Sequence, residues 1–300
     1  MVSVQKLLFI IPCLYEQQTI VPTLLHFLKI IDETKINADI FVVTTNKEKV
    51  KNEKSKTTYE VVQEFISEGE KYKAVHLLNY PGEDGMMADQ LNFVKEEIFK
   101  NYSLTATKTY FCVYNADSRP GKQAILELQR ITSKAEYPLV IQEYSALFSN
   151  LQSLSPIMKG FAVYQTNFEI TNGLTNSVLY SKFLRNHVVG HGLCLRFDYL
   201  QKIGGFTTDY WCEDIYLSFY LRDKDVSIYP MLALEYGETP KKLLILMKQN
   251  ANWFKTLSEA KKIYHSFHHG NLYNARLYYL NQIRGAIAWL TLPIIYRKLQ

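Results

Sequence analysis

Two sets of acidic side chains stand where catalytic chemistry is expected. Asp117 follows the apolar run 110–114 within Asn115-Ala-Asp-Ser, so its carboxylate is expected at the C-terminal tip of a strand. Such a carboxylate suits a divalent cation that bridges two phosphates, because hard cations take oxygen ligands and neutralise charge on a leaving group. A lone acid at a strand end also occurs without a metal, and the sequence leaves both interpretations open.

The second acidic set is Glu213-Asp214, which follows Gly204-Gly-Phe206 and opens an expected helix. Adjacent acids in a first helical turn have a structural explanation, because they interact favourably with the helix dipole. Alternatively, one carboxylate takes the proton from an attacking hydroxyl group. Spacing alone does not separate the two.

Two further motifs carry polar and aromatic groups suited to a ligand. Gln249, Asn252 and Trp253 lie on a segment of helical character. Trp253 either belongs to the core or offers its indole face to a sugar ring, with the amides serving hydroxyls or phosphate. His191, between Gly190 and Gly192, either satisfies a local hydrogen bond or contacts a ligand.

The elements that must position these residues alternate in the first half of the chain. Apolar runs predict strands at 7–12, 40–44, 74–79, 110–114 and 139–142, and three- to four-residue periodicity predicts helices at 19–31, 58–68, 86–99 and 122–133. This alternation is typical of a Rossmann-like parallel sheet with crossover helices. Loops 13–18, 45–46, 80–85 and 115–120 should therefore converge on one site at the carboxyl ends of the strands.

The other segments are simpler. We expect Asp84-Gly85 to cap the next helix, with or without a phosphate nearby, and the Lys- and Glu-rich stretch 46–58 to be a solvated loop. A long helix is predicted near 160–184, and His268-His269 is expected to form a surface turn. The apolar run 7–15 is interpreted as a buried strand in preference to a signal peptide, because no small-residue cleavage site follows it.

Composition indicates a folded enzyme-sized chain of 300 residues with 47% hydrophobic and 21% charged residues. The net charge of +5 is mild and no basic run alternates with aromatics, which argues against nucleic-acid binding. The four cysteines are far apart and lack metal-site spacing, so we expect reduced, mostly buried thiols in a cytosolic protein: Cys13, Cys112, Cys194 and Cys212.

The C-terminal segment from Asn271 carries an apolar stripe at helical spacing, made of Tyr273, Leu277, Leu280, Ile283, Ile287 and Leu290. Its uncharged run, 285–296, is too short to span a bilayer. The stripe either lies in a membrane interface or packs on the catalytic core or a second subunit. The sequence leaves these alternatives open.

The order of the motifs resembles glycosyltransferase family 2 of the GT-A fold, in particular the branch of cellulose and hyaluronan synthases, although without their transmembrane helices. The match runs from about residue 7 to 253 and consists of Phe9-Ile-Ile-Pro12-Cys-Leu-Tyr-Glu16, Ala88-Asp-Gln-Leu-Asn92, Asn115-Ala-Asp117, Gly190-His-Gly192, Gly204-Gly-Phe206, Glu213-Asp214 and Gln249-x-x-x-Trp253.

The resemblance implies a role for each matching position. Pro12, Glu16 and Thr44 would lie by the nucleotide, Asn115 and the metal-binding Asp117 by the diphosphate, and Gly190, His191 and Gly192 by the donor sugar. Asp214 would be the catalytic base with Glu213 beside it. Gln249, Asn252 and Trp253 would lie by the pyrophosphate and acceptor.

Three positions depart from the family pattern. Thr44-Thr-Asn46 replaces the usual aspartate pair, Met87 stands where a basic residue is common, and Asn252 replaces the Arg of QxxRW. Positive charge expected near the pyrophosphate is therefore missing, and the metal, Arg119, Lys248 or Lys255 would have to compensate.

Together these features predict an α/β GT-A fold with a mostly parallel central sheet, comprising a domain over 1–260 (nucleotide half about 1–120, acceptor half about 121–260) and a helical extension over 261–300. The expected activity is inverting, hexosyltransferase-like transfer from a nucleoside diphosphate sugar, UDP in the first instance, with Mn²⁺ or Mg²⁺, to a glycan or lipid-linked hydroxyl in polysaccharide biosynthesis. The alternatives are a catalytically degenerate scaffold and single transfer to polyprenyl phosphate. The expected location is the cytoplasm, including the inner face of the membrane, and the oligomeric state is undetermined.

Overall fold

The protein is an α/β fold built on one curled, mostly parallel sheet of eight strands in the order β3-β2-β1-β4-β7-β6-β8-β5. The computed structural model describes residues 5–51, 56–134, 138–179, 187–267 and 272–299. The strands are β1 (Lys6–Pro12), β2 (Ala38–Thr45), β3 (Val75–Tyr80), β4 (Thr109–Val113), β5 (Arg119–Pro120), β6 (Val140–Ala146), β7 (Leu193–Arg196) and β8 (Ile228–Tyr236). The predicted fold class is confirmed.

The first four strands form the predicted parallel half, with β1 between β2 and β4 and β3 beyond β2. Their apolar side chains alternate between two buried clusters, one on each face of the sheet. Helices α1 (Ile20–Thr34), α3 (Thr58–Ser67) and α5 (Lys122–Thr132) cover one face, and α4 (Met87–Asn101) and α8 (Phe197–Lys202) cover the other. Because helices pack on both faces of the sheet, these strands are buried on both sides and consist of continuous apolar runs.

The second half of the sheet holds three strands that sequence analysis did not predict, β7, β8 and the two-residue β5. β7 is antiparallel to both β4 and β6, while β8 is parallel to β6. The predicted fifth strand, β6, therefore runs parallel to β4 but is separated from it by β7. The inserted β7 brings the chain from the turn at residues 190–192 into the middle of the sheet.

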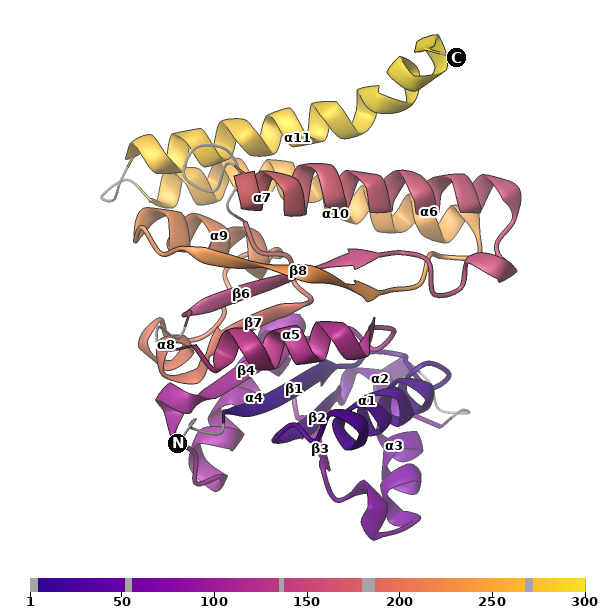
Figure 1. Ribbon diagram of the computed structural model, residues 1–300, viewed down its shortest axis with the longest axis vertical. Coiled ribbons are helices and arrows are strands. Elements are labelled where there is room, and N and C mark those ends of the chain that lie inside the picture. Colours follow the sequence, from indigo (N-terminus) through magenta and orange to yellow (C-terminus); the bar gives the residue numbers. More distant parts are fainter. Residues whose placement is uncertain (1–4, 52–55, 135–137, 180–186, 268–271, 300) are drawn as a thin grey trace.

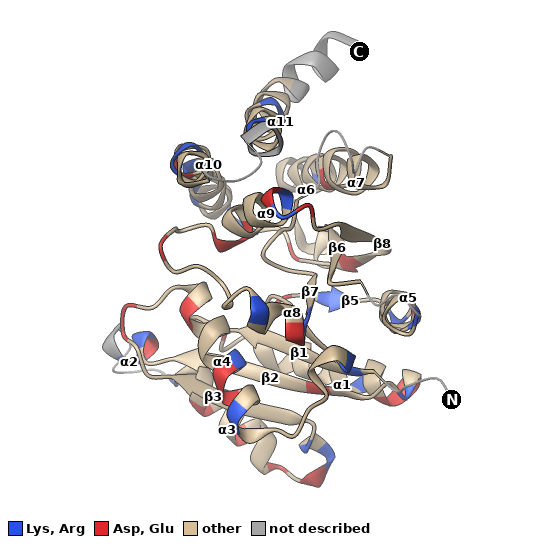
Figure 2. Ribbon diagram, turned by 90° about the vertical axis from the view of Figure 1, so that its left-hand side faces the viewer, with Lys and Arg blue, Asp and Glu red and all other residues tan. Residues whose placement is uncertain are grey.

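A layer of helices covers the β6–β8 end of the sheet (Figures 1 and 2). It consists of α6 (Pro156–Phe168), the π-helical segment η4 (Glu169–Leu174), α7 (Thr175–Leu179), α9 (Glu213–Asp223), α10 (Leu243–Ser266) and α11 (Leu272–Leu299). The predicted long helix is thus divided by a π-helical segment, and its residues 180–184, like His268 and His269, lie outside the described residues. α9, α10 and α11 contact one another.

α11 packs on the protein core, with Tyr278 buried beside Phe219 of α9 and Ile263 of α10. The predicted apolar stripe is only partly correct, because Leu280, Ile287 and Leu290 are each more than half exposed. Side chains of residues 271–275 and 292–300 are outside the described part. Among the described residues, no helix combines the length and hydropathy required to cross a membrane.

The loop that follows β1 is held by a carboxylate that the sequence did not single out. Glu48 lies on the short helix α2 (Lys47–Lys51), is 1% exposed, and accepts from the backbone N–H groups of Tyr15 (2.6 Å) and Thr58 (2.7 Å). The prediction that residues 46–58 form only a solvated loop is therefore wrong.

The motif at the start of α4 ties the two halves of the molecule together. The Asn92 amide donates to the Phe206 carbonyl (2.7 Å) and accepts from the Phe206 N–H (2.8 Å), while Lys95 donates to the Gly204 carbonyl (3.1 Å). Asp84 does not cap this helix, since its N-cap is Met86, whose N–H is bound by the Asp89 carboxylate at 2.7 Å. The Asn92 clamp fixes the chain a few residues before α9.

This clamp requires glycine at position 205. Gly205 has φ +100°, and a Cβ there would meet the Asn92 Oδ1 atom at 2.3 Å, whereas a Cβ at Gly204 (φ +84°) would meet nothing within 4 Å. Gly205→Ala should therefore destabilise the fold by about 3 kcal/mol, against about 1–2 kcal/mol for Gly204→Ala, which carries backbone strain alone. Urea unfolding measures both, and equal losses would show that the clamp contributes nothing.

Candidate functional site

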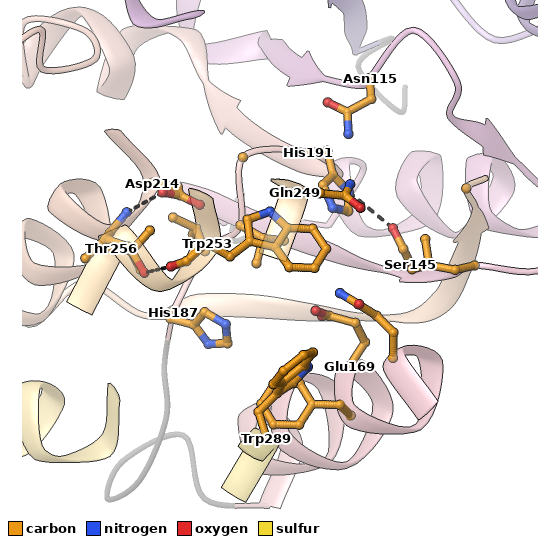
Figure 3. Close-up of a pocket in the computed structure, with 18 of the residues that line it drawn as sticks. Asn115, Ser145, Glu169, His187, His191, Asp214, Gln249, Trp253, Thr256 and Trp289 are labelled. Atoms are coloured by element: carbon orange, nitrogen blue, oxygen red, sulfur yellow. Dashed lines mark hydrogen bonds between the residues drawn. The ribbon is translucent and has the colours of Figure 1, made fainter. Parts of the chain in front are cut away.

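One pocket lies between the sheet and the helical layer, with a volume of about 410 Å³. Its walls come from the end of β4, from β6 and β8, from the segment 187–191, from the start of α9, and from α6, η4, α10 and α11. Figure 3 shows side chains from these elements pointing into the same space. The pocket lies beyond the carboxyl end of β4, as predicted for a sheet of this type.

The pocket brings together seven of the thirteen candidate residues: Asn115, Asp117, Gly190, His191, Asp214, Gln249 and Trp253. Six others do not line it: Pro12, Glu16, Thr44, Gly192, Glu213 and Asn252. Glu16 still lies within electrostatic reach of Asp117. Asn252 is exposed on α10. Residues up to 138 positions apart in sequence, Asn115 and Trp253, thus meet at one site.

The turn at Gly190-His191-Gly192 is fixed by a buried amide of β6. Gln142 donates to the His191 carbonyl (2.8 Å) and accepts from the Val189 N–H (2.9 Å). Gly192 has φ +61°, and a Cβ there would approach the Glu143 carbonyl oxygen to 2.6 Å. Glycine is therefore needed at this position by close strand packing, which gives Gly192 a structural role behind the pocket.

His191 is bound to a buried carboxylate. Its Nδ1 lies 2.5 Å from Oε1 of Glu235, a β8 residue that is 1% exposed, and the Ser145 hydroxyl of β6 donates to the same oxygen at 2.6 Å. Burial disfavours the imidazolium, but the charge of Glu235 and its hydrogen bond outweigh that cost and raise the pKa of His191 to about 9. Burial likewise opposes ionisation of Glu235, whose pKa is nevertheless lowered by His191. The pocket thus holds a cation at neutral pH.

The two acids of α9 share one environment. Burial, followed by repulsion from Asp214, raises the pKa of Glu213 to about 8, and burial also raises the pKa of Asp214. The backbone N–H of Ile215 donates to Asp214 Oδ1 at 2.7 Å and favours its ionised form, as does the charge of His191. The two carboxyls therefore titrate as a pair that holds a proton more tightly than isolated carboxyls do, and Asp214 is the member that lines the pocket.

Asp117 also lines the pocket, near other oxygen-bearing side chains. Its Oδ2 accepts from the Glu238 N–H at 3.4 Å, and Asn115 and Glu238 line the same wall. Burial and the charge of Asp117 raise the pKa of the neighbouring Glu16 carboxyl. Crowded carboxylates of this kind are stabilised by a cation.

No three His, Cys, Asp or Glu side chains within the described ranges form a complete metal cage. Magnesium and similar hard cations in nucleotide sites usually take one or two carboxylates and complete their shell with substrate phosphates and water. An oxygen-only set centred on Asp117 fits that mode of binding.

Of the three positions at which the motifs depart from the expected pattern, Thr44 lies in a network of neutral side chains and Met87 lines the pocket. Thr44 is 1% exposed and donates to Asn79 Oδ1 (2.9 Å), and Asn79 in turn donates to Asn46 Oδ1 (2.7 Å). Of the proposed substitutes for the missing charge, Arg119 is engaged by the Ser118 carbonyl (3.0 Å) and the Thr23 hydroxyl.

Lys248 and Lys255 do not line the pocket and are exposed on α10. Neither side chain therefore offers its charge to a ligand inside the pocket in this conformation. Among the described residues that line the pocket, His191 carries a positive charge at neutral pH.

Several pocket residues escaped sequence analysis: Ser145, Glu169, His187, Glu235, Gln282 and Trp289. Ser145 and Glu235 lie on strands whose pairing with each other no local pattern revealed. Trp289 lies within the uncharged run 285–296, which sequence analysis considered only for a membrane interface or for packing. The sequence did offer one signal for a pocket residue, because the helix that carries the apolar stripe also contains Gln282 and Trp289.

The ion pair gives a direct test by NMR titration of the histidine side chains. Because the folded-state pKa of His191 is raised above the ordinary value of about 6.5, the pair stabilises the fold fully below that pH, and the stabilisation is lost as pH rises through about 9. In Glu235→Gln the pKa of His191 should fall markedly toward its ordinary value.

His26 is the internal control, because burial lowers its pKa, its ring bonds the Pro120 carbonyl (2.8 Å), and Glu235 is not among the groups that shift its pKa, although Pro120 pairs with Glu235 across β5 and β8. It should titrate below the ordinary range in both proteins. A His191 resonance that titrates at the same pH with and without Glu235 would contradict the assignment.

No family model matches the chain, and no curated protein matches its sequence. Several solved structures, in contrast, resemble this chain in three dimensions. The mannosyltransferase PcManGT from Pyrobaculum calidifontis, in complex with GDP-Man and Mn²⁺, superposes with a TM-score of 0.61 at 12% identity, covering 99% of this chain and 81% of that one.

Glucosyl-3-phosphoglycerate synthase from Mycobacterium tuberculosis (TM-score 0.46, 9% identity, 81% and 74% coverage) gives a weaker likeness. So does the catalytic domain of Drosophila beta1,4galactosyltransferase 7 (TM-score 0.41, 13% identity, 80% and 71% coverage). The likeness to the Pyrobaculum structure establishes that this chain has the GT-A type of α/β fold.

Proposed function

We propose that this protein is a metal-dependent glycosyltransferase that moves a sugar from a nucleoside diphosphate to an acceptor hydroxyl group. The observation that carries the proposal is the convergence of Asp117, His191, Asp214 and Trp253 on one pocket of a GT-A fold. These residues supply, in turn, a metal ligand, a cation, a base and an aromatic face. Each matches one demand of glycosyl transfer.

Asp214 acts as the general base. Its carboxylate takes the proton of the acceptor hydroxyl while that oxygen attacks the anomeric carbon and the bond from this carbon to the diphosphate breaks. Attack from the face opposite the leaving group makes the transfer inverting. Glu213, whose pKa is raised to about 8, lies beside Asp214 in the first turn of α9 and shares the proton of the pair, while Asp214 is the member that lines the pocket.

Asp117, with Glu238 and Asn115 beside it, would hold Mn²⁺ or Mg²⁺ together with the donor phosphates. When bound, the cation neutralises charge on the departing diphosphate. The Pyrobaculum enzyme was solved with GDP-Man and Mn²⁺, which supports metal use here. His191, held as an imidazolium by Glu235, adds positive charge that Asn252 and Met87 do not supply.

The finer features of the proposal rest on the resemblance in motif order and, for the cytoplasmic location, on the widely spaced cysteines. They are membership of the family 2 group, a hexosyl donor with UDP as the first nucleotide to test, and a role in polysaccharide biosynthesis in the cytoplasm. The domain limits 1–260 and 261–300 belong to the same proposal. A peripheral membrane contact through the exposed face of α11 stays a prediction.

The rival hypothesis is a catalytically degenerate binding protein, suggested by the neutral network at Thr44, Asn79 and Asn46. Asp117 and Asp214 both remain in the pocket, which favours an enzyme. Slow release of nucleoside diphosphate from a donor in the presence of Mn²⁺ separates the two, since a pure binder releases none.

Two substitutions should separate chemistry from binding. Asp214→Asn removes the base and should lower turnover by about 100-fold or more while leaving donor affinity unchanged. Asp117→Ala should abolish the Mn²⁺-dependent part of donor binding, as should removal of the metal with EDTA. Calorimetry with UDP or GDP and an assay of nucleoside diphosphate release measure the two effects.

Asp209→Asn, an exposed aspartate in the loop before α9, is the matched control and should retain wild-type turnover. Near-wild-type turnover in Asp214→Asn would refute the assignment of the base. Metal-independent donor binding in the wild-type protein would refute the role of Asp117.

A further inference from the structure

Two tryptophans from different helices line the same end of the pocket. Trp253 of α10 and Trp289 of α11 are both pocket residues, and Figure 3 shows them pointing into it together with Glu169 and His187. Trp253 is 40% exposed. Indole faces that remain accessible in a pocket bind the apolar faces of sugar rings.

The Trp289 ring is held in place from two sides. Phe254 lies edge-on to it at 5.2 Å between ring centroids, and Tyr164 of α6 lies at 5.6 Å with a similar tilt. The Tyr164 hydroxyl also donates to the Trp289 carbonyl, which ties α6 to α11. The ring is thus pre-positioned, which reduces the entropy lost when a ligand stacks on it.

Polar groups suited to hydroxyls surround these rings. Glu169 of η4, Gln249 of α10 and Gln282 of α11 line the same pocket as the two tryptophans. Gln282 is 9% exposed, and its Nε2 has no hydrogen-bond partner among the described residues. A buried amide N–H without a partner costs free energy, and a ligand oxygen would relieve that cost.

Carboxylates outnumber cationic side chains along the described lining of the pocket, where the imidazolium of His191 is paired with Glu235. Glu169 and Asp214 both line the pocket, and the charge of Glu169 contributes to the raised pKa of His191. An acceptor that carries a phosphate would be repelled by these carboxylates, whereas uncharged hydroxyl groups can donate to them. The arrangement therefore favours a neutral ligand.

We infer that the pocket end formed by Trp253, Trp289, Glu169 and Gln282 is a subsite for an uncharged saccharide, and that this saccharide is the acceptor. The inference rests on the proposed function and narrows it, because it selects a glycan over polyprenyl phosphate. The acceptor ring stacks between tryptophans of α10 and α11, and its hydroxyls reach Glu169 and the amides. α11 is then part of the active site.

The test uses the full-length protein with Mn²⁺ and UDP. Saturation-transfer-difference NMR is recorded with cellobiose, maltose and lactose as neutral probes and with farnesyl phosphate as the anionic probe. The inference predicts transfer to at least one disaccharide and none to farnesyl phosphate. Binding of farnesyl phosphate without any disaccharide would overturn it.

Trp289→Ala should weaken disaccharide binding about tenfold, through loss of one stacking face. Trp211→Ala is the matched control, because Trp211 is 55% exposed and does not line the pocket. Equal affinity in both variants would overturn the subsite.

Glu169→Gln tests the sign of the ligand charge without removing packing. The affinity of a neutral saccharide should fall several-fold, since a charged acceptor of hydrogen bonds is replaced by a neutral one. Disaccharide affinity that is unchanged in this variant would overturn the place of Glu169 in the subsite.

Release of UDP or GDP from the corresponding nucleotide sugars keeps the two proposals apart. Slow donor hydrolysis that a disaccharide accelerates supports both. Donor hydrolysis without disaccharide binding sinks the saccharide subsite and leaves the glycosyltransferase proposal standing. Disaccharide binding without donor binding or hydrolysis supports a saccharide site and contradicts the glycosyltransferase proposal.

Discussion

The arrangement of the pocket is governed by carboxylates brought close together in a partly buried space. Asp117, Glu169, Asp214, Glu235 and Glu238 all line it. Like charges in such a setting raise one another's pKa values and oppose folding unless cations offset them. His191 offsets Glu235 directly through a contact of 2.5 Å. The charge that remains around Asp117 and Glu238 favours a divalent cation and its phosphate ligands.

This constraint also explains the scaffold around the pocket. The Gln142 amide holds the turn that carries His191, and the Asn92 clamp fixes the chain before Asp214. Neither amide lines the pocket. Two of the motifs singled out in the sequence, at residues 88–92 and 204–206, thus bind each other and hold the chain that leads into α9.

The sequence predicted the parallel half well because its signals are local. Apolar runs bounded by turns mark strands that are covered on both faces, and Asp117 was found because it directly follows one of them. β7 and β8 were missed for physical reasons. β7 has four residues, and β8 alternates irregularly between buried and exposed positions, with Leu232 at 70% exposure.

The polar partners across these strands could not be predicted for the same reason. The contact between His191 and Glu235 depends on the pairing of β6, β7 and β8, which no local pattern encodes. Trp289 likewise became a pocket residue only through the packing of α11 on α9 and α10. A functional residue that directly follows a strand can be predicted from the sequence, whereas a site assembled by tertiary packing cannot.

The central claim is that the acidic pocket binds a divalent cation jointly with a nucleoside diphosphate. Electron paramagnetic resonance of Mn²⁺ tests it most directly, since the sharp signal of the free aqueous ion falls when the ion is bound. The account predicts weak uptake of Mn²⁺ by the protein alone and much stronger uptake once UDP or GDP is added, beyond the uptake by the nucleotide itself. A free-ion signal that the protein leaves unchanged with either nucleotide would contradict the account.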